Sequence, residues 1–192
     1  MTKRQGSADG FALVEILVSL VIVLIGLLGV AGLQARALEA EMESYQHAQA
    51  TVLLQDMVDR INANRQTAPC YAITAADGAL FVGTGATVNL PVECAGFGDA
   101  NTQLQAENDI TDWHNLLLGA TETFEGNSVG AMIGARGCIV ATDVLNQIYT
   151  VAVAWQGLTD TAAPAVSCGN NQYGNEARRR VVWTTLRIAD LT

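Results

Sequence analysis

The chain has 192 residues and a formal net charge of −9, from 10 basic and 19 acidic side chains. A chain of this length can build one globular core beside a long helix. Its acidic balance excludes a general electrostatic attraction to nucleic acid or to anionic lipid.

The most distinctive stretch follows a short polar leader, MTKRQGSADG, and extends from Gly10 to Leu33. Apart from Glu15 and Ser19, the residues after Gly10 are apolar or small. About 20 apolar residues suffice to cross the ~30 Å hydrocarbon core of a bilayer as a helix. We therefore expect residues 11–34 to form the transmembrane half of an N-terminal helix.

The basic pair Lys3-Arg4 precedes this apolar stretch. Positive charge before a span keeps that end of the chain in the cytoplasm. The sequence thus predicts a single-pass protein of the inner membrane, with residues beyond about 34 in the periplasm.

Glu15 is the anomaly within the apolar stretch. A carboxylate in the membrane core costs about 2.5–3.5 kcal/mol on insertion scales, so such a residue is interpreted as functional. One alternative is a secretory signal peptide cleaved near Ala35-Arg36-Ala37, which the charge of Glu15 and the length of the stretch disfavour. Another is a plain signal anchor whose Glu15 reaches the interface, which leaves the spacing of Gly10, Phe11 and Glu15 unexplained.

Together, Lys3-Arg4, Gly10, Phe11, the apolar run and Glu15 resemble the class III signal of the type IV pilin family. The resemblance implies that a prepilin peptidase removes the leader 1–10 by cutting after Gly10 and then methylates the new amino terminus at Phe11. It also implies that Glu15 pairs with the terminal amine of a neighbouring subunit during filament assembly.

The predicted helix continues beyond the membrane as an amphipathic periplasmic half over residues 35–65. Residues 34–65 contain no Gly or Pro, and Asn62, Asn64 and Pro69 mark the end of the helix. Apolar residues at a spacing of three or four predict a packing face; they are Leu38, Met42, Tyr45, Val52, Leu54, Met57 or Val58, and Ile61.

Residues 66–192 are expected to form a disulfide-stapled periplasmic head. The four cysteines, Cys70, Cys94, Cys138 and Cys168, lie on the oxidising side of the membrane. Their even number predicts two disulfides with three possible connectivities, of which sequence order favours Cys70–Cys94 and Cys138–Cys168. There is no C-x-x-C motif, and His47 and His114 stand alone, so neither a metal nor a cofactor is expected.

Within the head, residues 66–108 are weakly patterned and rich in loop signals. A helix is predicted over Ile110–Leu118, with Asp109 as its N-cap and Trp113 in the core. Three strands are predicted at Gly137–Ala141, Asn146–Trp155 and Val181–Ile188.

Consecutive strands without intervening helices predict an antiparallel sheet. The fold class is therefore α+β and pilin-like, with the long N-terminal helix packed on a small C-terminal sheet domain. The basic run Arg178-Arg179-Arg180 lies beside the last strand, where we expect it to be solvated and to block stray strand pairing.

Three further segments resemble the PilV family of minor pilins: Leu54–Asn64, the unit Asp109-x-x-x-Trp113-x-x-x-Leu117, and the strand Tyr149–Trp155. The turn usual after the Trp-containing helix is replaced by Leu118-Gly119-Ala120-Thr121. This resemblance implies a low-abundance subunit that takes part in priming the type IV pilus near its tip, with other minor pilins and the major pilin, and so moves from the membrane to the cell surface.

Two other functions stay open. A minor pseudopilin of a type II secretion system would have the same leader and helix. A membrane-anchored periplasmic enzyme is disfavoured because the sequence has no Gly-x-Ser-x-Gly motif, no metal-spaced His pair and no phosphate-binding loop. No residue is therefore nominated as catalytic.

Overall fold

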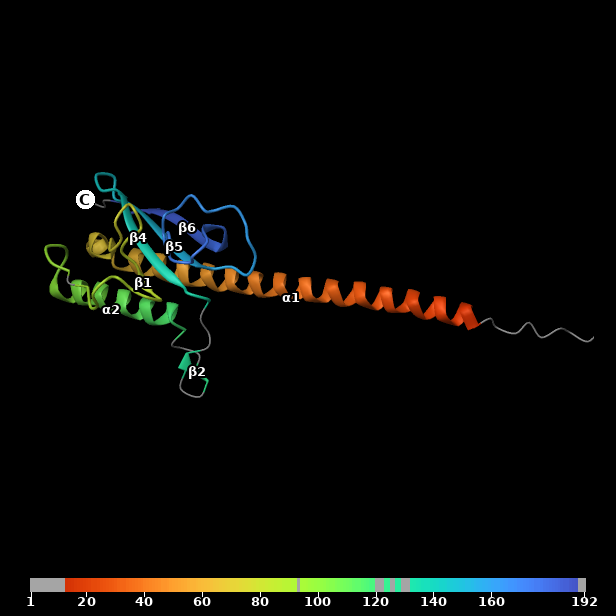
Figure 1. Cartoon of the computed structure of the whole chain (residues 1–192). Coiled ribbons are helices and arrows are strands. Elements are labelled where there is room, and N and C mark those ends of the chain that lie inside the picture. The colour runs from red at the N-terminus through yellow and green to blue at the C-terminus, as the bar shows by residue number, and fades with distance from the viewer. Residues whose placement is uncertain (1–12, 93, 120–122, 125–126, 129–131, 190–192) are drawn as a thin grey trace, which may run out of the picture. The chain divides into compact units, whose positions relative to one another are not determined.

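The computed structural model describes residues 13–92, 94–119, 123–124, 127–128 and 132–189. The chain divides into two compact units, Met1–Met42 and Glu43–Thr192 (Figure 1).

The first unit contains the beginning of helix α1 (Leu13–Ala63), which is continuous through Gly26, Gly29 and Gly32. The large apolar side chains between Leu13 and Leu33 are all exposed. The helix is long and apolar enough to cross a membrane. This half of α1 therefore presents apolar surface all round, as a helix surrounded by lipid or by other apolar helices does.

The second unit contains the rest of α1, the helix α2 (Ala100–Leu117) and a four-stranded antiparallel sheet in the order β1-β4-β5-β6. The strands span Val82–Gly83 (β1), Arg136–Asp143 (β4), Ile148–Gln156 (β5) and Arg179–Arg187 (β6). A separate hairpin pairs β2 (Thr123–Phe124) with β3 (Asn127–Ser128), and the short 3-10 helices are η1 (Arg65–Tyr71) and η2 (Glu176–Arg178). The predicted α+β class, with a long N-terminal helix and a C-terminal antiparallel sheet, is confirmed.

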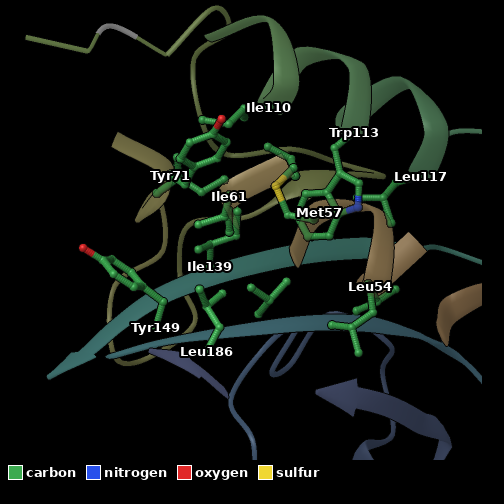
Figure 2. Packing of buried hydrophobic residues seen from close by; sticks show 14 of the residues in the cluster. Leu54, Met57, Ile61, Tyr71, Ile110, Trp113, Leu117, Ile139, Tyr149 and Leu186 are labelled. Atoms are coloured by element: carbon green, nitrogen blue, oxygen red, sulfur yellow. The ribbon is translucent and has the colours of Figure 1, made fainter. Parts of the chain in front are cut away.

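The main core lies between the helices and one face of the sheet (Figure 2). The second half of α1 contributes one row of buried residues, and the helix ends at Ala63, beside the predicted end signals. Trp113 on α2 is fully buried, as predicted for a core residue. An ideal Cβ on Gly137 of β4 would lie 2.4 Å from the Trp113 ring, so only glycine lets the indole approach the sheet this closely. The core side chains of α1 and β5 are Ala50, Leu54, Met57, Ile61, Tyr149, Val151, Val153 and Trp155.

The opposite face of the sheet is also covered. There Ala152 and Ala154 of β5 pack with Cys138, Cys168 and Tyr173 in a second cluster. The loop between β5 and β6 supplies Cys168 and Tyr173, so this long loop is a second layer over the sheet. The predicted alternation along β5 therefore places its odd-numbered residues in the main core and its even-numbered alanines in the second cluster, so both faces of the strand are buried.

The helix predicted over Ile110–Leu118 is longer than expected, and its predicted N-cap is wrong. α2 begins at Ala100, and Asp99 caps it by accepting hydrogen bonds from the backbone N–H groups of Asn101 and Thr102. Asp109 lies inside the helix and is buried. The prediction failed because the first half of α2 carries few apolar residues, so that the apolar spacing becomes clear only at Ile110.

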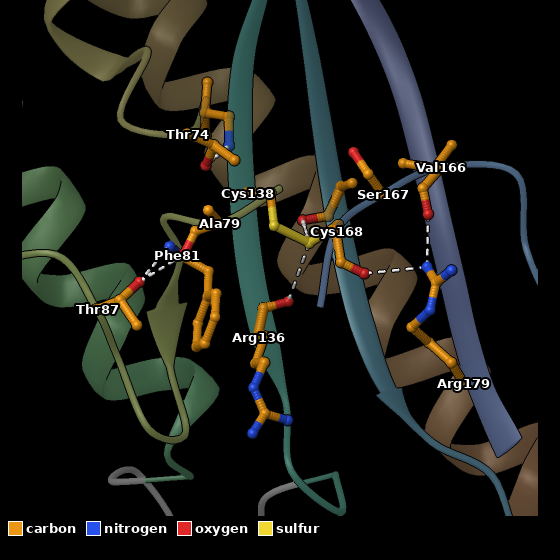
Figure 3. Close-up of a disulfide and its surroundings, with 12 residues drawn as sticks. Thr74, Ala79, Phe81, Thr87, Arg136, Cys138, Val166, Ser167, Cys168 and Arg179 are labelled. Carbon is orange, nitrogen blue, oxygen red and sulfur yellow. Dashed lines mark hydrogen bonds between the residues drawn. A yellow bond between two sulfur atoms is a disulfide. The ribbon is translucent and has the colours of Figure 1, made fainter. Parts of the chain in front are cut away.

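The expectation of a solvated arginine run is also wrong for two of its three members. Arg179 is only 3 % exposed and donates to the carbonyls of Val166 and Cys168 in the β5–β6 loop (Figure 3). It also donates to the Pro164 carbonyl of the same loop. Arg180 is mostly buried and pairs with Glu43 of α1, 3.1 Å away. Only Arg178 has the expected exposure. Carbonyl groups of the β5–β6 loop therefore bind Arg179, and the Glu43 carboxylate binds Arg180, so neither side chain is solvated.

Candidate functional site

Glu15 lies in the first turn of α1, with its side chain exposed among the apolar residues. In the part of the chain that the structure describes, no ion pair or side-chain hydrogen bond involves this carboxylate. Ser19, the other polar residue of the stretch, donates its hydroxyl to the Ile16 carbonyl, at 2.8 Å. The Ser19 hydroxyl is thus satisfied within the helix, and Glu15 places a carboxylate in the first turn of the apolar segment.

The remaining residues of the predicted signal lie outside the described residues. These are Lys3, Arg4, Gly10 and Phe11. Cleavage after Gly10, methylation of Phe11 and the role of Glu15 in assembly stay predictions.

Two disulfides join segments of the second unit in the pairing that sequence order favours. Cys70–Cys94 links η1 to the loop before α2, with Cα atoms 5.4 Å apart. Cys138–Cys168 links β4 to the β5–β6 loop, with Cα atoms 5.8 Å apart (Figure 3). The second bridge lies inside the cluster that covers the outer face of the sheet, next to the carbonyls that Arg179 binds.

The end of α1 is joined to α2 and η1 by a buried polar network. Arg60 of α1 donates to Asp109 of α2 at 3.0 Å. Tyr71 of η1 donates its hydroxyl to the other oxygen of Asp109 at 2.6 Å, and Gln105 adds a third bond at 2.8 Å. Burial, together with the hydrogen bond to Asp109, raises the pKa of Tyr71, which keeps its hydroxyl a donor.

Two further side chains hydrogen-bond across this junction. Asn64, the last residue of the segment Leu54–Asn64, donates to the Thr102 carbonyl at 2.8 Å and to the Tyr71 hydroxyl at 3.2 Å. Trp113 donates its indole N–H to the Leu53 carbonyl at 2.9 Å. Asn64 and Trp113 therefore add two hydrogen bonds to the contact between α1 and α2.

A second anchor lies at Glu43, the first residue of the second unit. One oxygen of Glu43 accepts bonds from the backbone N–H groups of Leu158 and Thr159, each at 3.0 Å, and from the Thr159 hydroxyl at 2.9 Å. Arg180 donates to the same oxygen from β6. Although partial burial opposes ionisation, these bonds and the charge of Arg180 lower the pKa of Glu43. The carboxylate thus fastens α1 to the start of the β5–β6 loop.

A buried cation near the second cluster was not anticipated from the sequence. Arg136 of β4 lies between the rings of Phe81 and Tyr173, with its guanidinium carbon 5.2 Å and 4.6 Å from their centroids. Its terminal nitrogen donates to the Gly134 carbonyl at 2.9 Å. Aromatic faces attract such a cation, so Arg136 ties β4 to the loops on both sides. The sequence places these three residues far apart and offers no signal that they meet.

The two histidines have different surroundings. His114 accepts a hydrogen bond at Nδ1 from the Gly83 N–H at 3.0 Å, and burial lowers its pKa. His47 is exposed and approaches the Trp155 ring edge-on, with centroids 5.9 Å apart. Among the described residues, no group of three or more His, Cys, Asp or Glu side chains is arranged to hold a metal ion.

Comparison with known proteins finds a match to one protein family. Residues 32–95, a third of the chain, match a family described as type IV pilin Tt1218. This match supports a type IV pilin and covers the second part of α1, η1, β1 and the Cys70–Cys94 bridge. No curated protein and no solved structure matches the chain.

Proposed function

We propose that the chain is a minor type IV pilin of the PilV kind, which takes part in assembling the pilus with other minor pilins and the major pilin. The observation that carries this proposal is the continuity of α1. One helix contains an exposed apolar segment with a single carboxylate near its start and then becomes part of the core of a disulfide-linked domain. The match over residues 32–95 supports the same class of protein.

In this proposal, the chain first lies in the inner membrane with its N-terminus in the cytoplasm. The prepilin peptidase cuts after Gly10 and methylates Phe11, so the mature chain is an anchored subunit that can leave the membrane only by joining a filament. The apolar first half of α1 suits both states, because lipid and neighbouring apolar helices offer it the same kind of contact.

Glu15 supplies the directional contact of the proposed assembly. Its carboxylate needs a cation in apolar surroundings, and an α-amino group is mostly protonated at neutral pH. In an ideal helix, two residues four positions apart are separated by about one turn along the axis, so we infer that Glu15 pairs with the terminal amine of an adjacent subunit. A head-to-tail contact of this kind propagates as a helical filament when its rotation does not close a ring, and this is the arrangement that the proposal requires.

Glu15 variants test this mechanism. Glu15→Ala should insert into the membrane as well as the natural chain but should be depleted from sheared pili and lose crosslinks to other pilins. Glu15→Asp should lie between the two, because it keeps the charge on a side chain one carbon shorter. Glu39→Ala is the matched control, since Glu39 is an exposed carboxylate of the same helix beyond the apolar segment. Normal incorporation of Glu15→Ala would remove the pairing mechanism.

A gene deletion separates the pilus from the secretion alternative. Loss of surface pili with normal secretion of exoproteins is the result expected for a minor pilin. Loss of secretion with normal pili would indicate a pseudopilin of a type II secretion system. An enzymatic role would gain support only from an activity detected in the purified protein.

A further inference from the structure

We propose that β6 is a docking edge that takes up an extended segment of another pilin subunit as an additional strand of the sheet. This inference rests on the proposed function, because it concerns how the folded unit contacts its neighbours in the filament. The strand is the last one in the order β1-β4-β5-β6, so among the described residues no strand pairs with its other side.

The register shows which backbone groups point away from the sheet. Gly157 donates its N–H to the Arg178 carbonyl at one end of the ladder, and Ile188 donates to the Gln147 carbonyl at the other. Opposite residues of an antiparallel pair alternate between exchanging both hydrogen bonds and exchanging none. The β6 side of both bonds is an even-numbered residue, Arg178 or Ile188, and the register between them is continuous. The even-numbered residues of β6 are therefore the ones that exchange hydrogen bonds with β5.

The odd-numbered residues therefore direct their N–H and C=O groups outward, at Val181, Trp183, Thr185 and Arg187. In the described part of the chain, no backbone hydrogen bond joins residues 181–187 to any segment other than β5. Before residue 181, backbone groups are bonded to other segments. The Arg179 N–H donates to the Glu176 carbonyl, and the Thr161 N–H donates to the Ala177 carbonyl.

Most of the usual protection of such an edge is missing, since Arg187 at the end of the strand is the one exposed charge among the residues of β6. Exposed strand edges are commonly guarded by charged side chains, by proline or by a bulge, because they otherwise pair with other chains. Here Arg179 and Arg180 are held by the β5–β6 loop and by Glu43, and β6 contains neither proline nor a register shift. β6 is thus a regular strand with β-branched and aromatic residues and an open side.

The side chains of the same outward-pointing residues define the partner. Trp183 is 55 % exposed, and Arg187 is exposed on the same face of the strand. A partner would therefore meet a row of backbone donors and acceptors, the Trp183 indole and the Arg187 guanidinium. They fit an extended polypeptide with an apolar residue opposite Trp183 and an acidic residue near Arg187, because cross-strand pairs of these kinds stabilise a sheet.

Amide hydrogen exchange can detect this pairing whichever subunit supplies the added strand. In the full chain purified in detergent, the N–H groups of residues 182, 184 and 186 should be protected and those of 183, 185 and 187 should exchange quickly. In sheared pili that contain the chain, the odd-numbered amides should slow by at least about tenfold, which converts an alternating pattern into a continuous one.

A matched pair of variants tests the same contact in assembly. Thr185→Pro removes one outward N–H and leaves every bond to β5 in place, whereas Thr185→Val keeps that N–H on a side chain of similar shape. Thr185→Pro should be incorporated into pili about three- to tenfold less than the natural chain, as expected for the loss of one net hydrogen bond. Thr185→Val should be incorporated normally. The unfolding midpoints of both variants establish that the fold is intact.

The outcomes separate this inference from the proposed function. A chain that never enters pili would overturn the pilin assignment itself. A chain that enters pili while its odd-numbered amides exchange as quickly as before would overturn strand addition alone. Odd-numbered amides that become protected in the isolated chain as its concentration rises would show that a second copy occupies the edge, which also contradicts the proposal.

Discussion

Arg60 and Asp109 are separated by 49 positions in the sequence, and their side chains meet at 3.0 Å in a network whose carboxylate is almost closed to solvent. Asp109 also accepts a hydrogen bond from the Tyr71 hydroxyl. The junction of α1, η1 and α2 therefore depends on one carboxylate. Arg60 and Asp109 each supply the charged partner of the other across this junction.

Asp109→Asn should destabilise the protein, because Arg60 loses its buried anion and the new amide N–H₂ group faces the Tyr71 hydroxyl. We expect a loss of about 1–3 kcal/mol in the free energy of unfolding, measured by chemical denaturation of the full chain in detergent. Asp112→Asn is the control: this carboxylate lies 3.6 Å from Arg60 with 63 % of its side chain exposed, so its loss should cost under about 0.5 kcal/mol. Equal losses in the two variants would contradict the role given to the network.

Glu43→Gln should weaken the attachment of α1 to the β5–β6 loop. The folded state lowers the pKa of Glu43 below its ordinary value through bonds to Leu158 and Thr159 and the charge of Arg180. A lowered carboxyl pKa contributes stability that is fully present above the unfolded pKa of about 4.3 and is lost as pH falls through the folded pKa.

The difference in unfolding free energy between the natural chain and Glu43→Gln should therefore be about 1–2 kcal/mol at pH 7 and should shrink as the pH falls below about 4.3 and through the lowered pKa of the folded state. Glu39→Gln, in an exposed ion pair with Arg36, should show little difference at either pH. A Glu43 effect that does not change with pH would mean that the charge of the carboxylate is unimportant.

The Cys138–Cys168 bridge should contribute more than the Cys70–Cys94 bridge. The loops that they close are similar, with sequence separations of 30 and 24, so loop closure alone predicts about 3–4 kcal/mol for each. Cys138 and Cys168 are also fully buried in the second cluster, where their packing with Ala152 and Tyr173 would be disturbed.

The test compares two double variants, Cys138→Ala with Cys168→Ala, and Cys70→Ala with Cys94→Ala. Unfolding free energies of the full chain should fall further in the first. Non-reducing peptide mapping of the natural chain should find both bridges and no free thiol. A larger loss in the second double variant would show that the bridge near α2, not the cluster over the sheet, limits stability.

The sequence predicts the main elements of this fold well, because they depend on local patterns. The alternation in Asn146–Trp155 identifies β5, the absence of Gly and Pro over residues 34–65 identifies the second half of α1, and Trp113 is recognisable as a core residue. The order of the four cysteines also favours the pairs that the structure contains. Each of these inferences needs only neighbouring residues or the chain order.

What the sequence does not reveal depends on partners that are distant in the chain. Glu43 resembles the other acidic residues of α1, and its four hydrogen bonds come from segments more than 100 positions away. Arg179 appears as one of three basic residues beside a strand, and only the converging carbonyls of the β5–β6 loop make it a buried residue. The first half of α2 lacks an apolar stripe, and its cap at Asp99 was therefore overlooked.

The central claim is that this chain is processed and assembled as a pilin, and the mass of its mature N-terminus tests that claim most directly. Mass spectrometry of the chain recovered from sheared surface pili should find an N-terminal peptide that begins at methylated Phe11. Gly10→Val should block the cut, because a branched side chain crowds the peptidase site, and should leave the full-length chain in the inner membrane. A mature terminus near Ala37, or an intact Met1 in the surface fraction, would contradict the account.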